Sequence, residues 1–249
     1  MIFESLQILA QFQQQPQGGS PIGMTYWVII GVSMIVSLAI SGMLKKRFNQ
    51  YSQIPIRMTG AQVAEAMLRQ NGINDVQVIS TPGHLTDHYD PIRKTVNLSE
   101  PVYHMNSVAA AAVASHECGH AVQHQQAYAW LTFRSKMVPA VQFASTIQQY
   151  LMFGAMIGAG FFHSTTMLWI WVAVFGVTTL FAVITLPVEF DASKRAMVWL
   201  EKSGIANQME HDRAKNALFW AAMTYVAGAV GAIAQLLYWL SVLQGRRDE

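Results

Sequence analysis

Long apolar runs without charges alternate with polar segments along this chain. About 20 apolar residues span the hydrocarbon core of a bilayer. Four runs reach that length, at residues 22–44, 139–162, 165–186 and 217–240. The sequence therefore predicts an integral membrane protein, mainly α, with about four transmembrane helices. Residues 1–21 are read as a lead-in and residues 241–249 as a tail.

The second run differs from the others because it carries Gln142, Gln148 and Gln149. Amides at membrane depth are expected to face protein or a cavity rather than lipid. Only His163 and Ser164 separate this run from the third. The two runs are therefore expected to form an antiparallel hairpin.

The polar segment at residues 45–138 shows alternating helix and strand patterns. Helices are predicted at residues 59–72 and 107–125, and short strands at residues 76–79 and 95–98. Together they predict a zincin-like α+β catalytic section. A second polar segment, at residues 187–216, has a helical pattern.

Composition and charge support this reading and orient it. Hydrophobic residues make up 52% of the chain and charged residues 12%, about half of the usual charged share in soluble proteins. Fourteen of the 16 Lys and Arg residues lie in the two polar segments, which therefore face the cytoplasm by the positive-inside rule. The net charge of +2 is too small to indicate a nucleic-acid partner.

The motif His116-Glu117-Cys118-Gly119-His120 lies in the second predicted helix. Histidines four residues apart share one helix face, so both can bind one Zn²⁺. Glu117 then lies within reach of a metal-bound water, where a general base belongs. The pattern also occurs by chance, in which case neither histidine binds a metal. Cys118 is the single cysteine, so no internal disulfide forms, and it is predicted to be a packing residue.

His124 repeats the four-residue spacing, but we expect it to be a polar residue on the helix face. On a straight helix it lies about 12 Å from His116, because each residue rises 1.5 Å. One zinc ion cannot bind both, since Zn–N bonds are about 2.1 Å long.

The third ligand is sought among the acidic residues after the motif, which are Glu189, Asp191, Glu201, Glu210, Asp212, Asp248 and Glu249. Glu189 stands out because it follows Pro187 at the end of the third run, where a carboxylate is costly without a partner such as zinc. The alternative is an acid at a helix N-terminus, stabilised by the macrodipole. Ser193 is a candidate to orient the carboxylate. Asp191 is expected to hold a histidine or a backbone group.

The loop at residues 85–91 (L-T-D-H-Y-D-P) offers two more candidates. His88 and Tyr89 are candidates to line the cleft or stabilise an oxyanion. The alternative is a turn held by Asp side chains. The strand at residues 95–98 is expected to offer an edge to which an extended peptide adds. His104 and Tyr225 are further candidates for the cleft.

Three motifs in order (H-E-C-G-H-A-V-Q-H, L-T-D-H-Y-D-P and T-L-P-V-E-F-D-A-S-K-R-A) resemble the YugP-type membrane zinc metallopeptidases, from about residue 59 to 229. The layout is more distantly similar to the HtpX and CAAX-prenyl membrane gluzincins. The resemblance implies His116, His120 and Glu189 as ligands of one Zn²⁺, with Glu117 as catalytic base. The distant families have an Asp four residues after the glutamate, where this chain has Ser193.

These observations predict a zinc-dependent metalloendopeptidase in the cell membrane. Its expected substrates are peptides or membrane proteins, cleaved at the cytoplasmic membrane surface. The alternative is a membrane scaffold or adaptor with a structural or inactive zinc site. Glu117 distinguishes the two, because a structural site needs no base and usually has four protein ligands. A small transporter is disfavoured, since the runs lack paired charges.

Overall fold

A computed structural model of the chain describes residues 23–156 and 164–246. The expected lead-in at residues 1–21 therefore lies outside the described residues. The elements, in chain order, are α2 (Met24–Ser52), α3 (Gly60–Gln70), β1 (Gln77–Thr81), β2 (His88–Asp90), β3 (Thr95–Ser99), α4 (Glu100–His104), α5 (Val108–Gln125), α6 (Ala129–Met156), α7 (Thr165–Ser203) and α8 (Gln208–Gly245).

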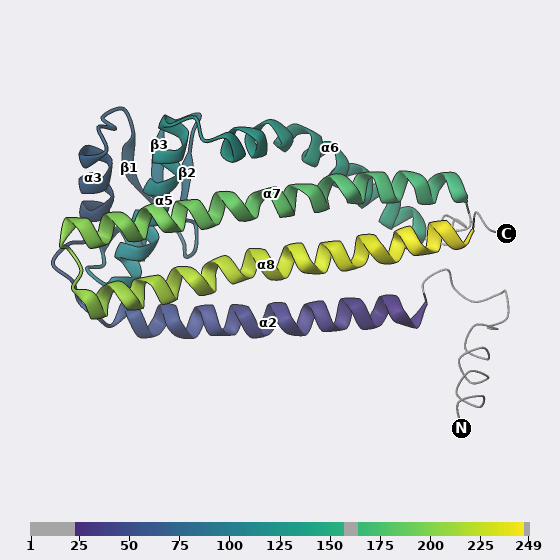
Figure 1. The fold of residues 1–249 in the computed structure, drawn as a ribbon, viewed down its shortest axis with the longest axis horizontal. Coiled ribbons are helices and arrows are strands. Elements are labelled where there is room, and N and C mark those ends of the chain that lie inside the picture. The colour runs from purple at the N-terminus through teal and green to yellow at the C-terminus, as the bar shows by residue number, and fades with distance from the viewer. Residues whose placement is uncertain (1–22, 157–163, 247–249) are drawn as a thin grey trace, which may run out of the picture.

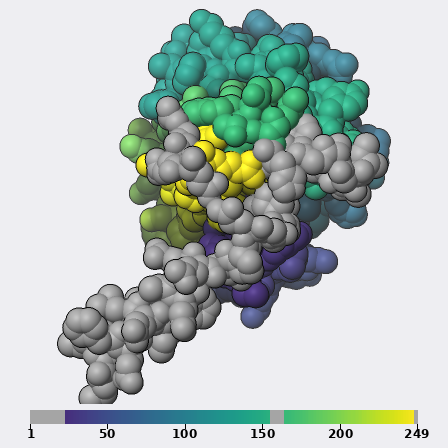
Figure 2. All heavy atoms as spheres, turned by 90° about the vertical axis from the view of Figure 1, so that its right-hand side faces the viewer, coloured from purple at the N-terminus to yellow at the C-terminus, as the bar shows by residue number. Residues whose placement is uncertain are grey.

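Four helices form a row. Helix α7 packs between α6 and α8, and α8 packs between α7 and α2. Figure 1 shows α2, α7 and α8 running side by side along the molecule. Seen from the end in Figure 2, teal, green, yellow and purple atoms follow one another from top to bottom, which is the order α6, α7, α8 and α2.

Three of the described helices are long and apolar enough to cross a membrane, namely α2, α7 and α8. They correspond to the first, third and fourth predicted runs. The second run, residues 139–162, extends beyond the described residues at its end. Within the described part its helix, α6, begins at Ala129, ten residues earlier than the predicted span, and contains Pro139.

A lobe at one end of the row holds α3, the sheet, α4 and α5 (Figure 1). Its core is continuous, with Val63, Met67 and Leu98 among the fully or almost fully buried side chains. Trp199 and Leu200, from the last turns of α7, belong to the same core. The lobe is therefore packed directly onto the long apolar helices rather than tethered to them.

The sheet has the order β1-β3-β2. Strand β3 pairs in parallel with β1 and antiparallel with β2. The expectation that β3 offers a free edge is therefore wrong, because both of its edges are already hydrogen-bonded. The outer strands are β1 and β2, and β2 lies in the segment predicted as a loop.

Helix α7 continues without a break through Pro187 to Ser203. Glu189 consequently lies in the middle of α7, where the backbone amides are already hydrogen-bonded within the helix. The alternative interpretation of Glu189 as an acid at a helix N-terminus is therefore wrong.

Candidate metal centre

Helix α5 presents the motif from the middle of the lobe. It begins after Ser107, whose hydroxyl accepts a hydrogen bond from the Ala110 amide at 3.2 Å, a helix-capping contact. Small alanine side chains then allow close packing against α3 and α7. At Gly119 a Cβ atom would lie 2.6 Å from the Ala192 carbonyl oxygen of α7. A glycine is needed there because the two helices approach so closely.

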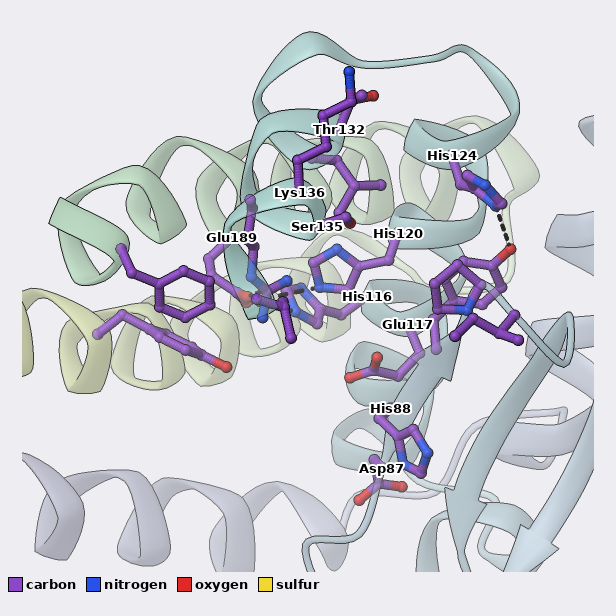
Figure 3. Close-up of a pocket in the computed structure, with 18 residues that line it drawn as sticks. Asp87, His88, His116, Glu117, His120, His124, Thr132, Ser135, Lys136 and Glu189 are labelled. Atoms are coloured by element: carbon purple, nitrogen blue, oxygen red, sulfur yellow. Dashed lines mark hydrogen bonds and ion pairs between the residues drawn. The ribbon is translucent and has the colours of Figure 1, made fainter. Parts of the chain in front are cut away.

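This close approach brings three potential ligands together. One ligand atom from each of His116, His120 and Glu189 lies within 4.8 Å of the others. Glu189 Oε2 is 3.3 Å from His116 Nε2 and 3.7 Å from His120 Nε2. Figure 3 shows the two imidazoles from α5 meeting the carboxylate from α7.

The Glu189 carboxylate is buried, with 3% of the residue exposed. Its Oε2 atom accepts no hydrogen bond from any of the described residues, and its Oε1 atom lies 3.8 Å from Arg134 Nη1. A buried carboxylate oxygen is costly without a hydrogen bond or a cation. Two imidazole nitrogens and one carboxylate oxygen are a donor set that suits Zn²⁺, so the residues fit that metal.

The outer nitrogen of each histidine has its own partner. His116 Nδ1 lies 3.1 Å from Ser193 Oγ, and His120 Nδ1 lies 3.0 Å from Gln123 Oε1. Such contacts leave each Nε2 directed toward Glu189. Ser193, expected to orient the Glu189 carboxylate, therefore contacts a histidine instead.

Asp191 is linked to the ligand His120 through the side chain of Gln123. It accepts hydrogen bonds from Gln123 Nε2 at 2.8 Å and from Arg195 Nε. It reaches His120 only through Gln123, and it does not touch either histidine directly. Asp191 was expected to hold a histidine or a backbone group, but the hydrogen bonds it accepts come from the side chains of Gln123 and Arg195.

A cavity of about 670 Å³ opens beside the three ligands. Glu117 lines it, is 8% exposed, and makes no hydrogen bond or ion pair with the described residues. In Figure 3 its carboxylate lies between His116 and His88. Glu117 is therefore available to a molecule in the cavity.

Strand β2 and the residues around it form one wall of this cavity. His88 and Tyr89 both line it, and the Tyr89 hydroxyl lies 2.8 Å from His124 Nδ1. Asp87 accepts hydrogen bonds from the Ser99 amide and hydroxyl, and Asp90 accepts from two amides of the following turn. Aspartates therefore fix the backbone of this segment, and His88 and Tyr89 line the cavity, whereas a role of either residue in stabilising an oxyanion stays a prediction.

Of the remaining candidate residues, some line the cavity and others lie away from it. Tyr225 lines the cavity from α8, whereas His104 is exposed and packs on Tyr103 away from it. His124 lines the cavity but lies outside the group of three ligands. Cys118 is fully buried against α3, as expected for a packing residue.

Burial and neighbouring charges shift several pKa values near the site. Burial, helped by Asp75 and Asp90, raises the pKa of Tyr89 to about 12, so its phenol keeps its proton at neutral pH. Burial also raises the pKa of Cys118 well above its ordinary value, which makes the thiol unreactive. Burial alone lowers the pKa of His120, but Glu189 and Glu117 outweigh it and the net shift is upward.

Two residues that contact the ligands were not foreseen from the sequence. Gln123 lies within the motif H-E-C-G-H-A-V-Q-H but was given no role there, and Arg134 lies outside the three motifs. The only available signal was the position of Gln123, three residues after His120 on the same helix face.

Comparison with known proteins agrees with the resemblance seen in the motifs. Residues 26–244 match the family described as "Putative neutral zinc metallopeptidase". The "Putative membrane protease YugP" of Bacillus subtilis (strain 168) is 40% identical over 208 residues, which cover 83% of this chain and 91% of that protein. No solved structure matches the chain. The match over most of the length and the identity to this relative show that the chain belongs to the neutral zinc metallopeptidase family.

Proposed function

We propose that this protein is a zinc-dependent endopeptidase that hydrolyses peptide bonds at the cytoplasmic surface of the cell membrane. His116, His120 and Glu189 would hold one Zn²⁺, and Glu117 would act as the general base. The observation that carries the proposal is the convergence of three ligand atoms within 4.8 Å beside a cavity that Glu117 also lines.

The chemistry divides between the metal and the chain. When bound, zinc supplies a Lewis acid that polarises water and a substrate carbonyl. The Glu117 carboxylate takes the proton of the attacking water and then passes it to the leaving amine. The absence of other partners for Glu117 among the described residues supports this role, because its oxygens are not engaged elsewhere.

Strand β2 is the part of the site best suited to hold an extended peptide. It is one of the two outer strands of the sheet, and His88 and Tyr89 on it line the cavity. An extended chain can add to such an edge through main-chain hydrogen bonds. The peptide would then run beside Glu117, which supports cleavage within a chain.

The start of α6 supports a site near the membrane surface. Trp130 and Phe133 are about half exposed there, next to Arg134 and Lys136 in the sequence. Aromatic and basic side chains concentrate at membrane–water interfaces. Since Arg134 also contacts Glu189, the ligands lie close to this aromatic and basic segment. Together with the Lys and Arg distribution, this supports a cytoplasmic interface and substrates in or near the bilayer.

A structural zinc site is less consistent with this geometry. Structural sites usually have four protein ligands, whereas the described residues bring three together. The open cavity beside them leaves a coordination position accessible, which is a property of catalytic sites.

The proposal is tested with purified full-length protein, wild type and Glu117→Gln. Zinc content and cleavage of an unfolded membrane-protein substrate are measured on both. We expect about one zinc per chain in both proteins, since glutamine removes the base but no ligand, and a rate at least about 100-fold lower in the variant. Wild type without zinc, or full activity in Glu117→Gln, contradicts the proposal. Glu189→Ala, which removes a ligand, is expected to lose the metal.

A further inference from the structure

The side chain of Gln123 connects the motif helix to the helix that carries Glu189. It is completely buried, with 0% exposed. Its Oε1 atom lies 3.0 Å from His120 Nδ1. Its Nε2 atom donates to the Val188 carbonyl and to Asp191 Oδ2, both at 2.8 Å.

The partners on α7 determine which way the amide points. A backbone carbonyl can only accept a hydrogen bond, so the atom of Gln123 that faces Val188 must be the NH₂ group. The Asp191 carboxylate, which also receives Arg195 Nε, imposes the same orientation. The other end of the amide, facing His120, is therefore the carbonyl oxygen.

This orientation in turn determines the tautomer of His120. An amide oxygen only accepts, so the hydrogen bond at 3.0 Å requires a proton on His120 Nδ1. In the neutral imidazole that metals bind, the lone pair is then on Nε2. That is the nitrogen that faces Glu189 Oε2 at 3.7 Å.

His116 lacks an equivalent constraint. Its Nδ1 contacts the Ser193 hydroxyl at 3.1 Å. A hydroxyl can either donate or accept, so this contact is compatible with both tautomers. The two histidines of the motif are therefore prepared to different degrees.

We propose that Gln123 is the residue that positions His120 for the metal, by holding its tautomer and by tying α5 to α7 beside Glu189. The inference rests on the proposed function, since it assigns Gln123 a role at the same zinc site. Residues that hydrogen-bond a metal-binding histidine typically contribute about 10–100-fold to metal affinity.

The test measures Zn²⁺ affinity of the full-length protein by competition with a chelator. Gln123→Met keeps the side-chain length and removes both hydrogen-bonding groups, so we expect zinc binding about 10–100-fold weaker than in wild type. The matched control is Gln70→Met. Gln70 also bridges to α7, through Trp199 Nε1 at 2.8 Å, but it lies outside the group that holds the histidines. Its variant is expected to bind zinc like wild type.

A spectroscopic measurement separates positioning from general stability and needs no variant. In the zinc-free full-length protein, ¹⁵N NMR of the imidazole rings distinguishes a protonated from an unprotonated ring nitrogen. We expect neutral His120 to carry its proton on Nδ1, because the Gln123 amide oxygen accepts from that nitrogen at 3.0 Å.

The outcomes distinguish this inference from the proposed function. Wild type that binds no zinc overturns the proposed function itself. Wild type that binds zinc, with Gln123→Met binding equally well, overturns only the role of Gln123. If Gln123→Met does not fold, the ring spectrum of wild type decides, because a neutral His120 with its proton on Nε2 overturns the tautomer argument.

Discussion

Helices α5 and α2 are both apolar around most of their circumference, yet their surroundings differ completely. Most residues of α5 are buried inside the protein, including Glu117 and His120. In α2 only Tyr51 is buried, and large side chains such as Ile35 and Leu38 are about two-thirds exposed. An apolar helix without a polar face belongs either in a protein core or in a membrane.

The side chains show which environment each helix has. Helix α5 has a run of alanines and a glycine where it meets other helices, so backbones come close and polar ligands can be buried among them. Helix α2 has valine, isoleucine and methionine facing outward, as a lipid environment requires. The lobe therefore depends on internal packing, whereas the outer face of α2 has the composition of a surface that faces lipid.

The largest contrast is expected from truncating matched methionines in the two regions. Met67 is 1% exposed in the lobe, whereas Met34 is 57% exposed on α2. Met67→Ala is expected to lower the free energy of unfolding by about 2–5 kcal/mol, because it leaves a cavity. Met34→Ala is expected to change it by less than about 0.5 kcal/mol. Denaturant unfolding in detergent micelles measures both, and equal effects contradict the comparison.

Removal of zinc is expected to affect the lobe and to spare α2. With free zinc at 100 to 1,000 times the dissociation constant, a chelator should lower the free energy of unfolding by about 3–4 kcal/mol. Hydrogen exchange should become faster in α5 and in α7 around Glu189, with α2 unchanged. Glu189→Ala serves as the control, because a protein without the site should not respond to the chelator.

Adding a methyl group distinguishes the two regions at smaller scale. In Gly119→Ala the new Cβ meets the Ala192 carbonyl oxygen, so α5 and α7 must separate, at a cost of about 1–3 kcal/mol. Zinc affinity should fall with it, since the separation moves the histidines from Glu189. Gly42→Ala is the matched change on α2, where no atom lies within 4 Å, and it should be neutral or stabilising by up to about 1 kcal/mol. Thermal unfolding with and without zinc provides the measurement.

The smallest effect is expected at the lobe surface, where Lys94 donates to Asp75 and holds the pKa of that carboxyl below its ordinary value. Because folding lowers this pKa, the pair stabilises the fold above the unfolded pKa of about 3.9 and loses its effect as pH falls through the lowered value. The stability difference between wild type and Lys94→Met should therefore be present at pH 7 and shrink below pH 4. A difference that grows in acid would contradict the assigned sign.

Much of the lobe could be predicted because its helices carry local start signals. Thr59 and Gln62 form a reciprocal capping pair at the start of α3, and Ser107 caps α5. Strand β2 could not be predicted, because it has three residues, and only its pairing with β3 makes it a strand. The early start of α6 was missed because Arg134 and Lys136 interrupt its apolar pattern.

Some residues of the candidate site could likewise be predicted from the sequence, and others could not. The histidine spacing and Glu117 follow from helix geometry, and Glu189 from the cost of a charge at the end of an apolar run. The contacts of Gln123 and Arg134 with the ligands depend on how α5, α6 and α7 pack together. Nothing in the local sequence states which way a glutamine or an arginine on a helix will face.

The separation of the ligands along the chain also sets when the site can form during synthesis. Glu189 follows His120 by 69 residues (189 − 120) and lies in a different helix. At about 5–20 residues per second, a ribosome therefore needs several seconds to add the third ligand after the motif. A growing chain thus carries Glu117 and both histidines before it carries a complete centre, and it gains the full ligand set only when α7 has been made and docked beside α5.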